Sequence, residues 1–513
     1  MAAVNKIDSN VVGLRYSVEV SIGTLAGSPI WLELEPNSFN DFGGELTALA
    51  RNPINPSRQR KKGSIVDLTA SGSWAQDMTQ SNFQELLPSF MFSAADLAVQ
   101  FGGSGEVTNV DGTADEYDAA DSLDVFAVGD LIFAKGFTNS ANNGLKEIDG
   151  LTADTNISVV ETIVDETPPA TATLEKVGVQ AGSADLDVDA SGSLPIITSS
   201  TLDFTTLNLS AGDWFHVGGD LAADQFATAA NNGWKRIRSV TANAITIDKS
   251  VAAMVTETGT GLTVRLFVGR SHRNKTGADI VRTSYQFERT LGAPDDSFLS
   301  QIQSEYLTGS VGNTLSVDFS TASLLTAELS FLSLDAEQRT GATGVKSGTR
   351  PTLASESAFN TSSDVSRIKL STVSDTDEAP VALFAFVEEF SLEVNNNLTQ
   401  EKAIGVLGSF DVTAGTFTVS GNITAFFSDV AAVSAVRNNA DVTLDAIMVK
   451  ENAGVVIDIP LLSLGDGRPN VEQDAAIKIP LTLDAATASS ISTDMDHTLS
   501  LNFFQYLPDA ADI

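Results

Sequence analysis

Cysteine is absent from the sequence, which excludes disulfides, thiolate metal sites and cysteine nucleophiles. Histidine is almost as scarce: only His216, His272 and His497 occur, far apart and at no motif spacing from a serine or a carboxylate. We interpret each of them as a packing or surface residue. The motifs G-x-S-x-G, P-loop and H-E-x-x-H are missing as well. We therefore expect no enzyme, and no catalytic, cofactor-binding or metal-binding residues.

Long apolar runs and positive charge are also lacking. No run of about 18 apolar residues occurs, so the sequence predicts no membrane-spanning helix. The N-terminal segment MAAVNKIDSN lacks the apolar core of a signal peptide, and we expect the protein to be made and at first kept in the cytoplasm. Lys and Arg number 30 against 66 Asp and Glu, a formal net charge of −36. Such a field repels nucleic acid and anionic membranes, and it favours either high solubility or a surface to which a passing polyanion does not stick.

Two short motifs suggest a binding site at first sight. Asp185, Asp187 and Asp189 resemble the start of an EF-hand loop, but the sixth position is Ala190 and the twelfth is Ile196. The outward face of a strand explains them better. The run Gly-Gly-Ser-Gly at 102–105 lacks the strand and helix that phosphate binding needs, so we interpret it as a flexible joint.

The few cations that are present gather at Arg58, Arg60, Lys61 and Lys62. They lie in the segment 36–64, which has no clear periodicity and contains Pro53 and Pro56, so the sequence predicts a long irregular loop. A solvated loop and docking onto an acidic neighbouring subunit both account for the cluster. Four cations in so acidic a chain do not make a nucleic-acid site.

The apolar pattern predicts β structure. At 513 residues, with 42% apolar side chains, the chain is long enough for three or four packed domains. Glu388 to Phe427 is typical of a strand, a polar loop and a second strand, in which residues 417–425 alternate between apolar and polar. Ser428 is the expected cap of a following helix, with valines at 430, 433 and 436 at roughly helical spacing.

The same pattern occurs 349 positions earlier, where Gly72 stands in place of Gly421. Leu68, Ala70 and Trp74 share its apolar face, and a helix from Thr79 to Leu87, ended by Pro88, is expected to follow. A strand, a glycine, a cap and a helix in one register favour an internal duplication.

Residues 105–270 contain a second repeat, of another kind. The segments 126–159 and 209–247 share a Gly-Asp pair, an Asn-Asn-Gly run (142–144 and 231–233) and the pair Lys146 and Lys235. Asn-Gly between apolar segments predicts a tight turn. We interpret the region as two small β modules, 105–180 and 181–270.

Later segments complete the prediction. Alternation returns over 315–331, residues 338–365 are expected to form a linker, and three further strands lie between 455 and 507. Pro460 and Pro480 within two of these strands imply edges or bulges. The domains expected are 1–104 with 271–345 as a discontinuous first domain, the two inserted modules, and 346–513 as a second domain.

These residues resemble a known family. GLRYSVE near the start, SYQFER at 284–289, the long segment 306–334, and the segments 390–408 and 415–429 are similar to the tail tube (major tail) proteins of long-tailed bacteriophages, in the version whose tube domain is duplicated. The likeness covers about 1–104 and 271–513, and its motifs are structural. The resemblance implies a mainly β fold: two tube-type β-sandwich or barrel domains, each with a flanking α-helix, and the two inserted β modules outside the tube.

The resemblance further implies self-association. Three duplicated chains are expected to form a ring with pseudo-sixfold symmetry, whose sheets join into an inner β-barrel, and the loops at 36–64 and 393–410 are expected to stack one ring on the next. Tape measure, tail terminator and distal tail or baseplate proteins are the implied partners, in a virion assembled in the host cytoplasm. DNA is expected to pass through the lumen without specific binding.

Three hypotheses follow. The first is a structural virion protein that builds the tail tube for genome delivery. The second is a virion-surface or extracellular module that recognises a glycan or receptor through residues 105–270. The third, a β-rich hydrolase using clustered carboxylates, has no preferred residue in this sequence.

Overall fold

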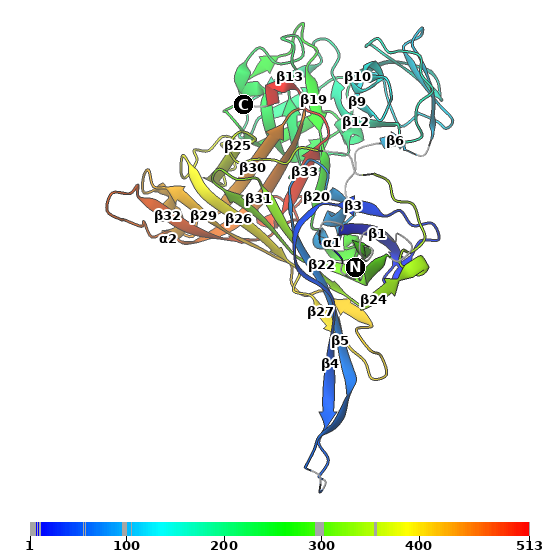
Figure 1. The fold of residues 1–513 in the computed structure, drawn as a ribbon. Helices are drawn as coiled ribbons and strands as arrows, with labels where there is room; N and C mark the ends of the chain where they lie inside the picture. Colours follow the sequence, from blue (N-terminus) through cyan, green and yellow to red (C-terminus); the bar gives the residue numbers. More distant parts are fainter. Residues whose placement is uncertain are drawn as a thin grey trace.

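The computed structural model describes residues 7, 9, 12–54, 56, 58–94, 100–103, 105–292, 302–352 and 356–511. The chain is mainly β, with 50% strand and 8% helix, and its large sheets are antiparallel (Figure 1). One sheet has 17 strands and a second has 14. Within the described residues no sheet closes into a barrel. The predicted fold class, mainly β with sandwich domains, is confirmed.

The two halves of the 17-stranded sheet repeat one topology. The first half consists of β1 (Gly13–Ser21), β3 (Leu32–Leu34), β4 (Pro36–Arg51), β5 (Lys61–Asp77), α1 (Leu87–Met91), β21 (Tyr285–Gly292), β22 (Gln303–Ser320), β23 (Thr326–Ser333) and β24 (Asp335–Thr340). The second half consists of β25 (Val365–Thr372), β26 (Val387–Asn395), β29 (Thr418–Phe426), α2 (Ala431–Arg437), β30 (Val442–Lys450), β31 (Ala453–Asp466), β32 (Lys478–Ala485) and β33 (Ser500–Phe504).

The strand order is the same in both halves. In the first, β4, β5, β23 and β22 lie side by side, and β1, β21, β22 and β24 form the other layer. In the second, the corresponding orders are β26, β29, β32, β31 and β25, β30, β31, β33. A short helix follows β5 in the first half and β29 in the second. β22 and β31 are long because each takes part in both layers.

The register that the sequence suggests also holds. Gly72 lies between Phe42 and Phe331, and Gly421 lies between Leu392 and Leu483 at the same place in its half. On β5 and β29 every second residue around these glycines is buried, while its neighbours are more exposed. The alternation predicted for both strands is confirmed.

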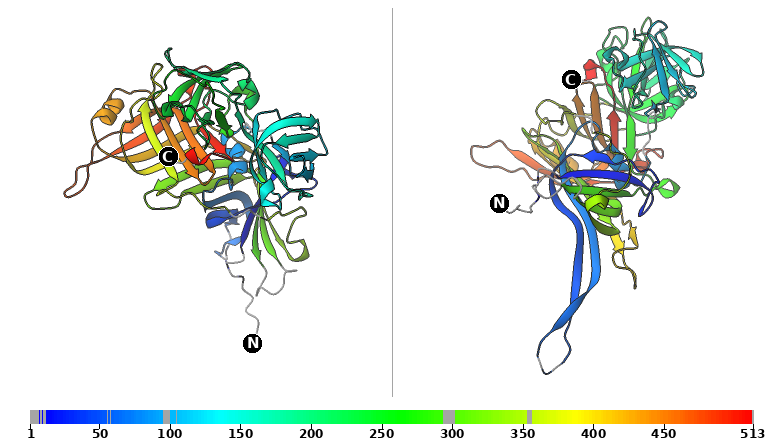
Figure 2. Two further views of the ribbon diagram at one scale, coloured as in Figure 1. Left: turned by 90° about the horizontal axis from the view of Figure 1, so that it is seen from above. Right: turned by 45° about the vertical axis from the view of Figure 1, so that its right-hand side comes forward.

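The loop predicted for 36–64 is wrong over most of its length. β4 continues to Arg51 and β5 begins at Lys61, so the two strands form a long hairpin that projects from the body (Figures 1 and 2). Pro53 and Pro56 lie in its terminal turn region. The stem residues are exposed on both faces, including Leu49 at 67%. Without a buried face the sequence has no alternation there.

Both predicted helices are displaced along the chain. Pro88 does not end a helix but stands in the first turn of α1, where its missing N–H costs no hydrogen bond. The helix ends at Phe92, which adopts a left-handed φ of 50°. Ser428 does not cap α2: the carboxylate of Asp429 accepts a hydrogen bond from the Ala431 N–H at 2.7 Å.

The predicted linker at 338–365 begins inside β24 and ends at the first residue of β25, and its described residues from 341 to 364 form no extended strand. It packs back on the first half, where the Trp31 indole N–H donates to the Ser347 carbonyl at 3.1 Å. The proline predictions are confirmed. Pro460 lies beside a register shift between β30 and β31, and Pro480 pairs with β29 where β31 no longer flanks β32.

Residues 105–270 build the 14-stranded sheet. Its strands are β6 (Gln100–Gly102), β7 (Val107–Asp111), β8 (Glu116–Ala119), β9 (Asp130–Lys135), β10 (Gly144–Ala153), β11 (Asn156–Val159), β12 (Thr173–Gln180), β13 (Leu186–Asp189), β14 (Ile196–Ser199), β15 (Trp214–Val217), β16 (Gly233–Thr241), β17 (Ala244–Ser250), β18 (Glu257–Thr258) and β19 (Arg265–Val268). β12 pairs with both β9 and β19 and so joins the two modules. The chain returns to the 17-stranded sheet, called the wall below, through β20 (Arg270–Arg273), which pairs with β33.

The Asn-Asn-Gly runs are not hairpin turns. The first Asn of each run is the last residue of a short 3₁₀ turn, and the glycine begins a strand. Asn142 donates to the Val164 carbonyl at 2.9 Å, and Asn231 donates to the Val255 carbonyl at the same distance. Each module therefore contains the same buried asparagine hydrogen bond, which explains why the Asn-Asn-Gly run is repeated. Of the run at 102–105, Gly102 lies in β6 and Ser104 lies outside the described residues.

Candidate assembly surfaces

The hairpin β4–β5 is the most projecting feature of the molecule. β4 has 16 residues, so the ribbon extends for about 50 Å at roughly 3.3 Å per residue. Ile54 at its end is fully exposed, and Leu46, Ile65 and Val66 along the stem are each more than half exposed. Exposed apolar groups on a lone ribbon are typical of a surface that another protein covers.

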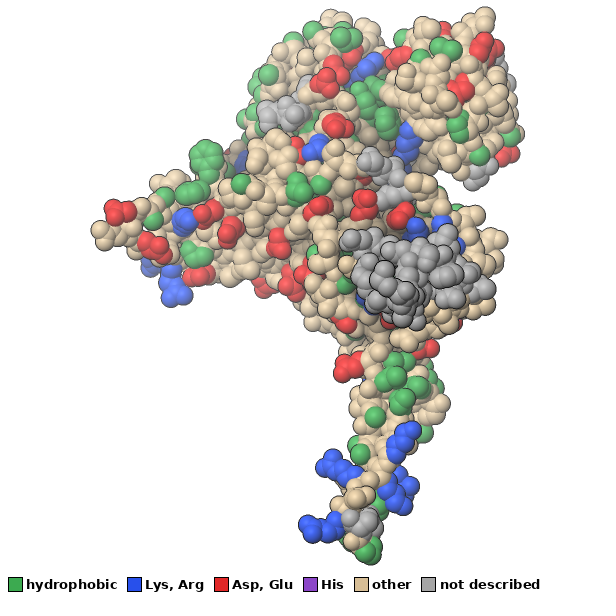
Figure 3. Space-filling view, in the orientation of Figure 1, with side chains coloured by type: hydrophobic (Ala, Val, Ile, Leu, Met, Phe, Trp, Pro, Cys, Tyr) green, Lys and Arg blue, Asp and Glu red, His purple; other side chains and the backbone are tan. Residues whose placement is uncertain are grey.

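The tip of this hairpin is basic. Arg51, Arg58, Arg60, Lys61 and Lys62 are all exposed, and none of them forms an ion pair with any residue that the structure describes. Figure 3 shows these cations gathered at the end of the ribbon, below a body whose visible face carries many carboxylates. The sequence located the cluster, but it did not predict the ribbon that carries the cations away from the body.

A shorter projection occupies the corresponding place in the second half. Between β26 and β29, the strands β27 (Thr399–Glu401) and β28 (Asp411–Thr413) form a small hairpin that lies against the root of the long one. Gln400 donates to the Ala70 carbonyl at 2.9 Å, and Lys402 lies 2.6 Å from the Asp67 carboxylate. The hydrogen bond from Lys402 lowers the pKa of Asp67.

One ladder joins the two halves into a continuous sheet. The end of β22, Thr314–Ser320, pairs antiparallel with β26 from Asn395 to Glu389. The strand at the edge of the layer β4, β5, β23 and β22 therefore binds the strand at the edge of the layer β26, β29, β32 and β31 by backbone hydrogen bonds. This junction shows how two copies of the repeat fit together.

Each end of that sheet has a free edge. Among the described residues β4 pairs with β5 alone, and β31 beyond Leu462 has β32 on one side and no strand on the other. The counterparts of these two edges, β26 for β4 and the end of β22 for the end of β31, are the strands that pair at the junction between the halves. Unpaired N–H and C=O groups of this kind are a template for pairing with another chain.

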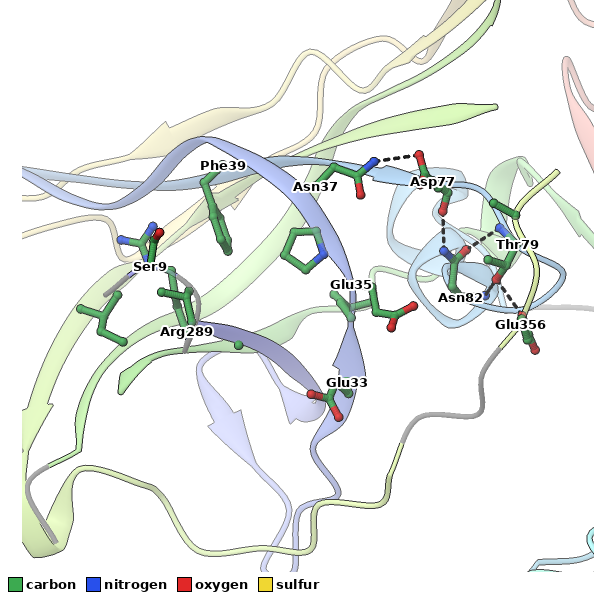
Figure 4. Close-up of a pocket in the computed structure, with 16 residues that line it drawn as sticks. Ser9, Glu33, Glu35, Asn37, Phe39, Asp77, Thr79, Asn82, Arg289 and Glu356 are labelled. Atoms are coloured by element: carbon green, nitrogen blue, oxygen red, sulfur yellow. Dashed lines mark hydrogen bonds between the residues drawn. The ribbon is translucent and has the colours of Figure 1, made fainter. Parts of the chain in front are cut away.

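A cavity of about 840 Å³ lies at the root of the long hairpin. It is lined by the first residues of β1 and β4, the end of β5 and part of the segment after residue 355 (Figure 4). Four carboxylates line it: Glu33, Glu35, Asp77 and Glu356. Arg289 is the one cation among the lining residues, and its Nε donates to Glu305 outside the cavity at 3.0 Å.

The second half has a hollow at the corresponding place. About 530 Å³ in volume, it is lined by the first residues of β25 and β26, and Phe386 at its edge is 73% exposed. The end of β22, Phe319–Thr321, lines it as well. The end of β22 thus closes one side of the second hollow. Within the described part of one chain, no corresponding strand end closes that side of the first cavity.

The three histidines are packing residues. His216 lies edge-on to Trp234 with ring centroids 5.3 Å apart, and His272 lies in the same way against Phe503 at 5.6 Å. All three are buried, so the packing interpretation is right and the surface one is wrong. Burial lowers the pKa of His216 to about 3 and that of His497 to about 3.

The acidic triplet serves local structure. Asp185 accepts from the Ser200 N–H at 2.9 Å, Asp187 from the Gly259 N–H at 3.1 Å, and Asp189 from the Ser191 N–H at 2.9 Å. No group of three or more potential metal ligands occurs in the described part of the chain. No described helix is long and apolar enough to cross a membrane.

The inserted modules pack on the second half, although they interrupt the first. Trp214 and Trp234 share an apolar cluster with Val456 and Phe504. Strands β30 and β31 are consequently buried on both faces, one against the sandwich core and one against the insert.

Charges that link the insert to the wall are fully buried. Arg236 of β16 donates to Asp248 at 2.9 Å and to Asp458 of β31 at 3.2 Å. Lys249 of β17 and Arg367 of β25 both contact Asp445 of β30. Burial raises the pKa of Asp445, but the two cations outweigh it and hold that pKa below its ordinary value. No local sequence pattern predicts this cluster, because its members are far apart along the chain.

A sequence model of the family described as phage tail tube protein matches residues 9–485. No curated protein matches the chain. Among solved structures, a chain of the phage phi92 endosialidase is 10% identical and covers 90% of this chain and 71% of its own, with a TM-score of 0.15. Such a score carries no argument about fold or activity. The family match spans both repeats and the insert, and the chain belongs to the phage tail tube protein family.

Proposed function

We propose that this structural tail protein self-assembles into rings of three chains, which stack into the tail tube through which the phage genome is delivered. The observation that carries the proposal is the β22–β26 ladder between two halves of identical topology. A repeat that already pairs with its own copy inside one chain has the edges needed to pair with a copy in another chain. Six repeats from three chains would give the pseudo-sixfold ring.

The internal ladder also supplies a register for ring closure. When the halves are superimposed on Gly72 and Gly421, Gly465 corresponds to Thr314 and Glu45 corresponds to Asn395. Thr314 pairs with Asn395 within the chain, so Gly465 of one chain should pair with Glu45 of the next. Asp466 then lies beside this pair. The wall formed in this way would be a barrel whose strands alternate between a dry and a wet face.

Ring closure can be tested because the chain has no cysteine of its own. We expect the double variant Glu45→Cys/Gly465→Cys to oxidise into covalent trimers, because the two residues lie directly opposite each other in the proposed ladder, are at opposite edges of one chain and meet only between chains. Each single variant is the control and should stay monomeric on a non-reducing gel. A ladder that continues beyond three chains would refute the stoichiometry.

Electron microscopy of the purified protein tests the function itself. Stacked rings with three chains in the end-on view support the proposal, and rings of six chains contradict the role of the duplication. Discrete monomers would count against a tube and favour a surface module that binds a glycan or receptor through residues 105–270.

The remaining assignments belong to the same proposal. The wall would consist of 1–104 with 271–345 and of 346–513, with the modules 105–180 and 181–270 outside the lumen. Tape measure, tail terminator and distal tail or baseplate proteins would bind the ends of the tube in a virion assembled in the host cytoplasm. The net charge of −36 supports a lumen through which DNA slides without specific binding.

A further inference from the structure

We infer that the basic tip of the β4–β5 hairpin seats in the acidic cavity at the root of the same hairpin in a chain of the next ring. The inference rests on the proposed function, since it names the contact that joins one ring to another. The occupant of the cavity is a second copy of this chain.

The first argument is charge. The tip presents five cations, and none of them pairs with a residue that the structure describes. The cavity presents four carboxylates, of which Glu35 is exposed. The other three also have partners within the chain: Glu33 pairs with Arg15, Asp77 accepts from Asn37, and Glu356 accepts from Thr79 and Ser81. Chains with a net charge of −36 repel one another, so a contact between rings needs a local region of opposite sign on one partner. The tip carries the densest group of cations in the sequence.

The second argument is position. The cavity is lined by Pro36, Asn37 and Asp77, which are the first residues of β4 and the last of β5. Tip and cavity therefore lie at the two ends of one ribbon. A contact between different ends of identical chains is heterologous, and it repeats indefinitely along an axis instead of closing on itself. The ribbon length of about 50 Å sets an upper limit on the rise from ring to ring.

The third argument is that the cavity is incomplete in one chain. In the second half, the end of β22 closes one side of the corresponding hollow. In a ring, the end of β31 from the neighbouring chain would stand at that side of the first cavity. The acidic cavity would thus be complete only after ring closure, so that rings form before they stack.

Ile54 extends the contact beyond charge. It is fully exposed at the end of the hairpin, and the lining of the cavity includes apolar groups such as Leu34 and Leu291. Burial of one apolar side chain among carboxylates and cations resembles the centre and rim of a protein interface.

Two charge-reversed proteins test the inference together. The tip variant Arg58→Glu/Arg60→Glu/Lys61→Glu/Lys62→Glu has an acidic tip and an acidic cavity. The cavity variant Glu35→Arg/Asp77→Arg has a basic tip and a basic cavity. We expect each alone to form rings but at least tenfold less stacked tube than the wild type, measured by sedimentation and electron microscopy. A one-to-one mixture should restore tubes in which the two proteins alternate, because every contact again joins opposite charges.

The controls separate the possible failures. The variant Arg58→Lys/Arg60→Lys keeps the sign of the tip and should stack like the wild type. Normal stacking of the tip variant alone would overturn the inference, and so would a mixture that stays unstacked although both variants form rings. A wild-type protein that forms neither rings nor tubes would instead contradict the proposed function.

Discussion

Replacing Arg236 by methionine is expected to uncouple the insert from the wall. The guanidinium is 2% exposed and lies between Asp248 of the insert and Asp458 of the second half. Methionine fills much of the space but leaves two carboxylates buried without this cation. Removing one partner of a buried ion pair costs about 3–5 kcal/mol, because the remaining charge is neither solvated nor paired.

The measurement is chemical unfolding followed by tryptophan fluorescence. Trp214 and Trp234 lie in the interface between the insert and the wall, so their emission reports on this contact. We expect the transition to move to lower denaturant by an amount that corresponds to about 3–5 kcal/mol. The insert should separate first, because its own two cores do not depend on Arg236.

A matched control lies two residues away. Arg238 of the same strand pairs with Asp375, which is 77% exposed, and it also lies 3.9 Å from Asp248 and donates to the Ile491 carbonyl. Arg238→Met should lower the unfolding free energy clearly less than Arg236→Met, because Arg236 still pairs with Asp248 and the other partner, Asp375, is exposed. Adding Asp248→Asn and Asp458→Asn to Arg236→Met should recover most of the loss, since no unpaired charge is then buried. If Arg236→Met costs no more than Arg238→Met, water reaches the cluster and the reasoning fails.

Three other experiments test the fold. Gly421→Ala should destabilise the wall by about 1–3 kcal/mol, because its Cβ would lie 2.3 Å from the Ser391 carbonyl oxygen, whereas Gly72→Ala meets only a side chain and should cost less; thermal unfolding compares them. Burial lowers the pKa of Lys235 to about 7, so above that pH the Lys235 amine is protonated in the unfolded chain but neutral in the folded chain. The free energy of unfolding should therefore rise between about pH 7 and 10, by up to about 1.4 kcal/mol per pH unit. A slope that persists in Lys235→Met would contradict this. Asn231→Ala should cost about 1–3 kcal/mol, seen as faster hydrogen exchange in the second module alone.

Alternation was sufficient to predict the wall. Strands such as β5 and β29 have one face in the core and one face in solvent, so apolar and polar side chains alternate along their sequences. The matched glycines then indicated the duplication. At Gly421 the Ser391 carbonyl oxygen leaves no space for a Cβ, and at Gly72 the Leu307 side chain occupies that space. The topology shared by the two halves follows the same signal.

The assembly surfaces were harder to predict because no core contact defines them. The stem of the β4–β5 hairpin is exposed on both faces in one chain, so its residues are free of the pattern that marks a buried strand. The acidic cavity collects Glu33, Asp77 and Glu356 from three distant segments. The cluster around Arg236 likewise joins residues more than 200 positions apart. Long-range placement of this kind needs the three-dimensional fold.

The unequal lengths of the two hairpins have a consequence for how rings are oriented. A ring of six identical repeats could be placed on its neighbour in any of six rotations. In this chain one repeat carries the long β4–β5 ribbon and the other only the short β27–β28 hairpin. A ring of three such chains has a threefold axis, and half of those rotations would set a short hairpin where a long one is needed. Each ring would therefore inherit its angular phase from the one before it, and the tube would keep a defined helical order along its length.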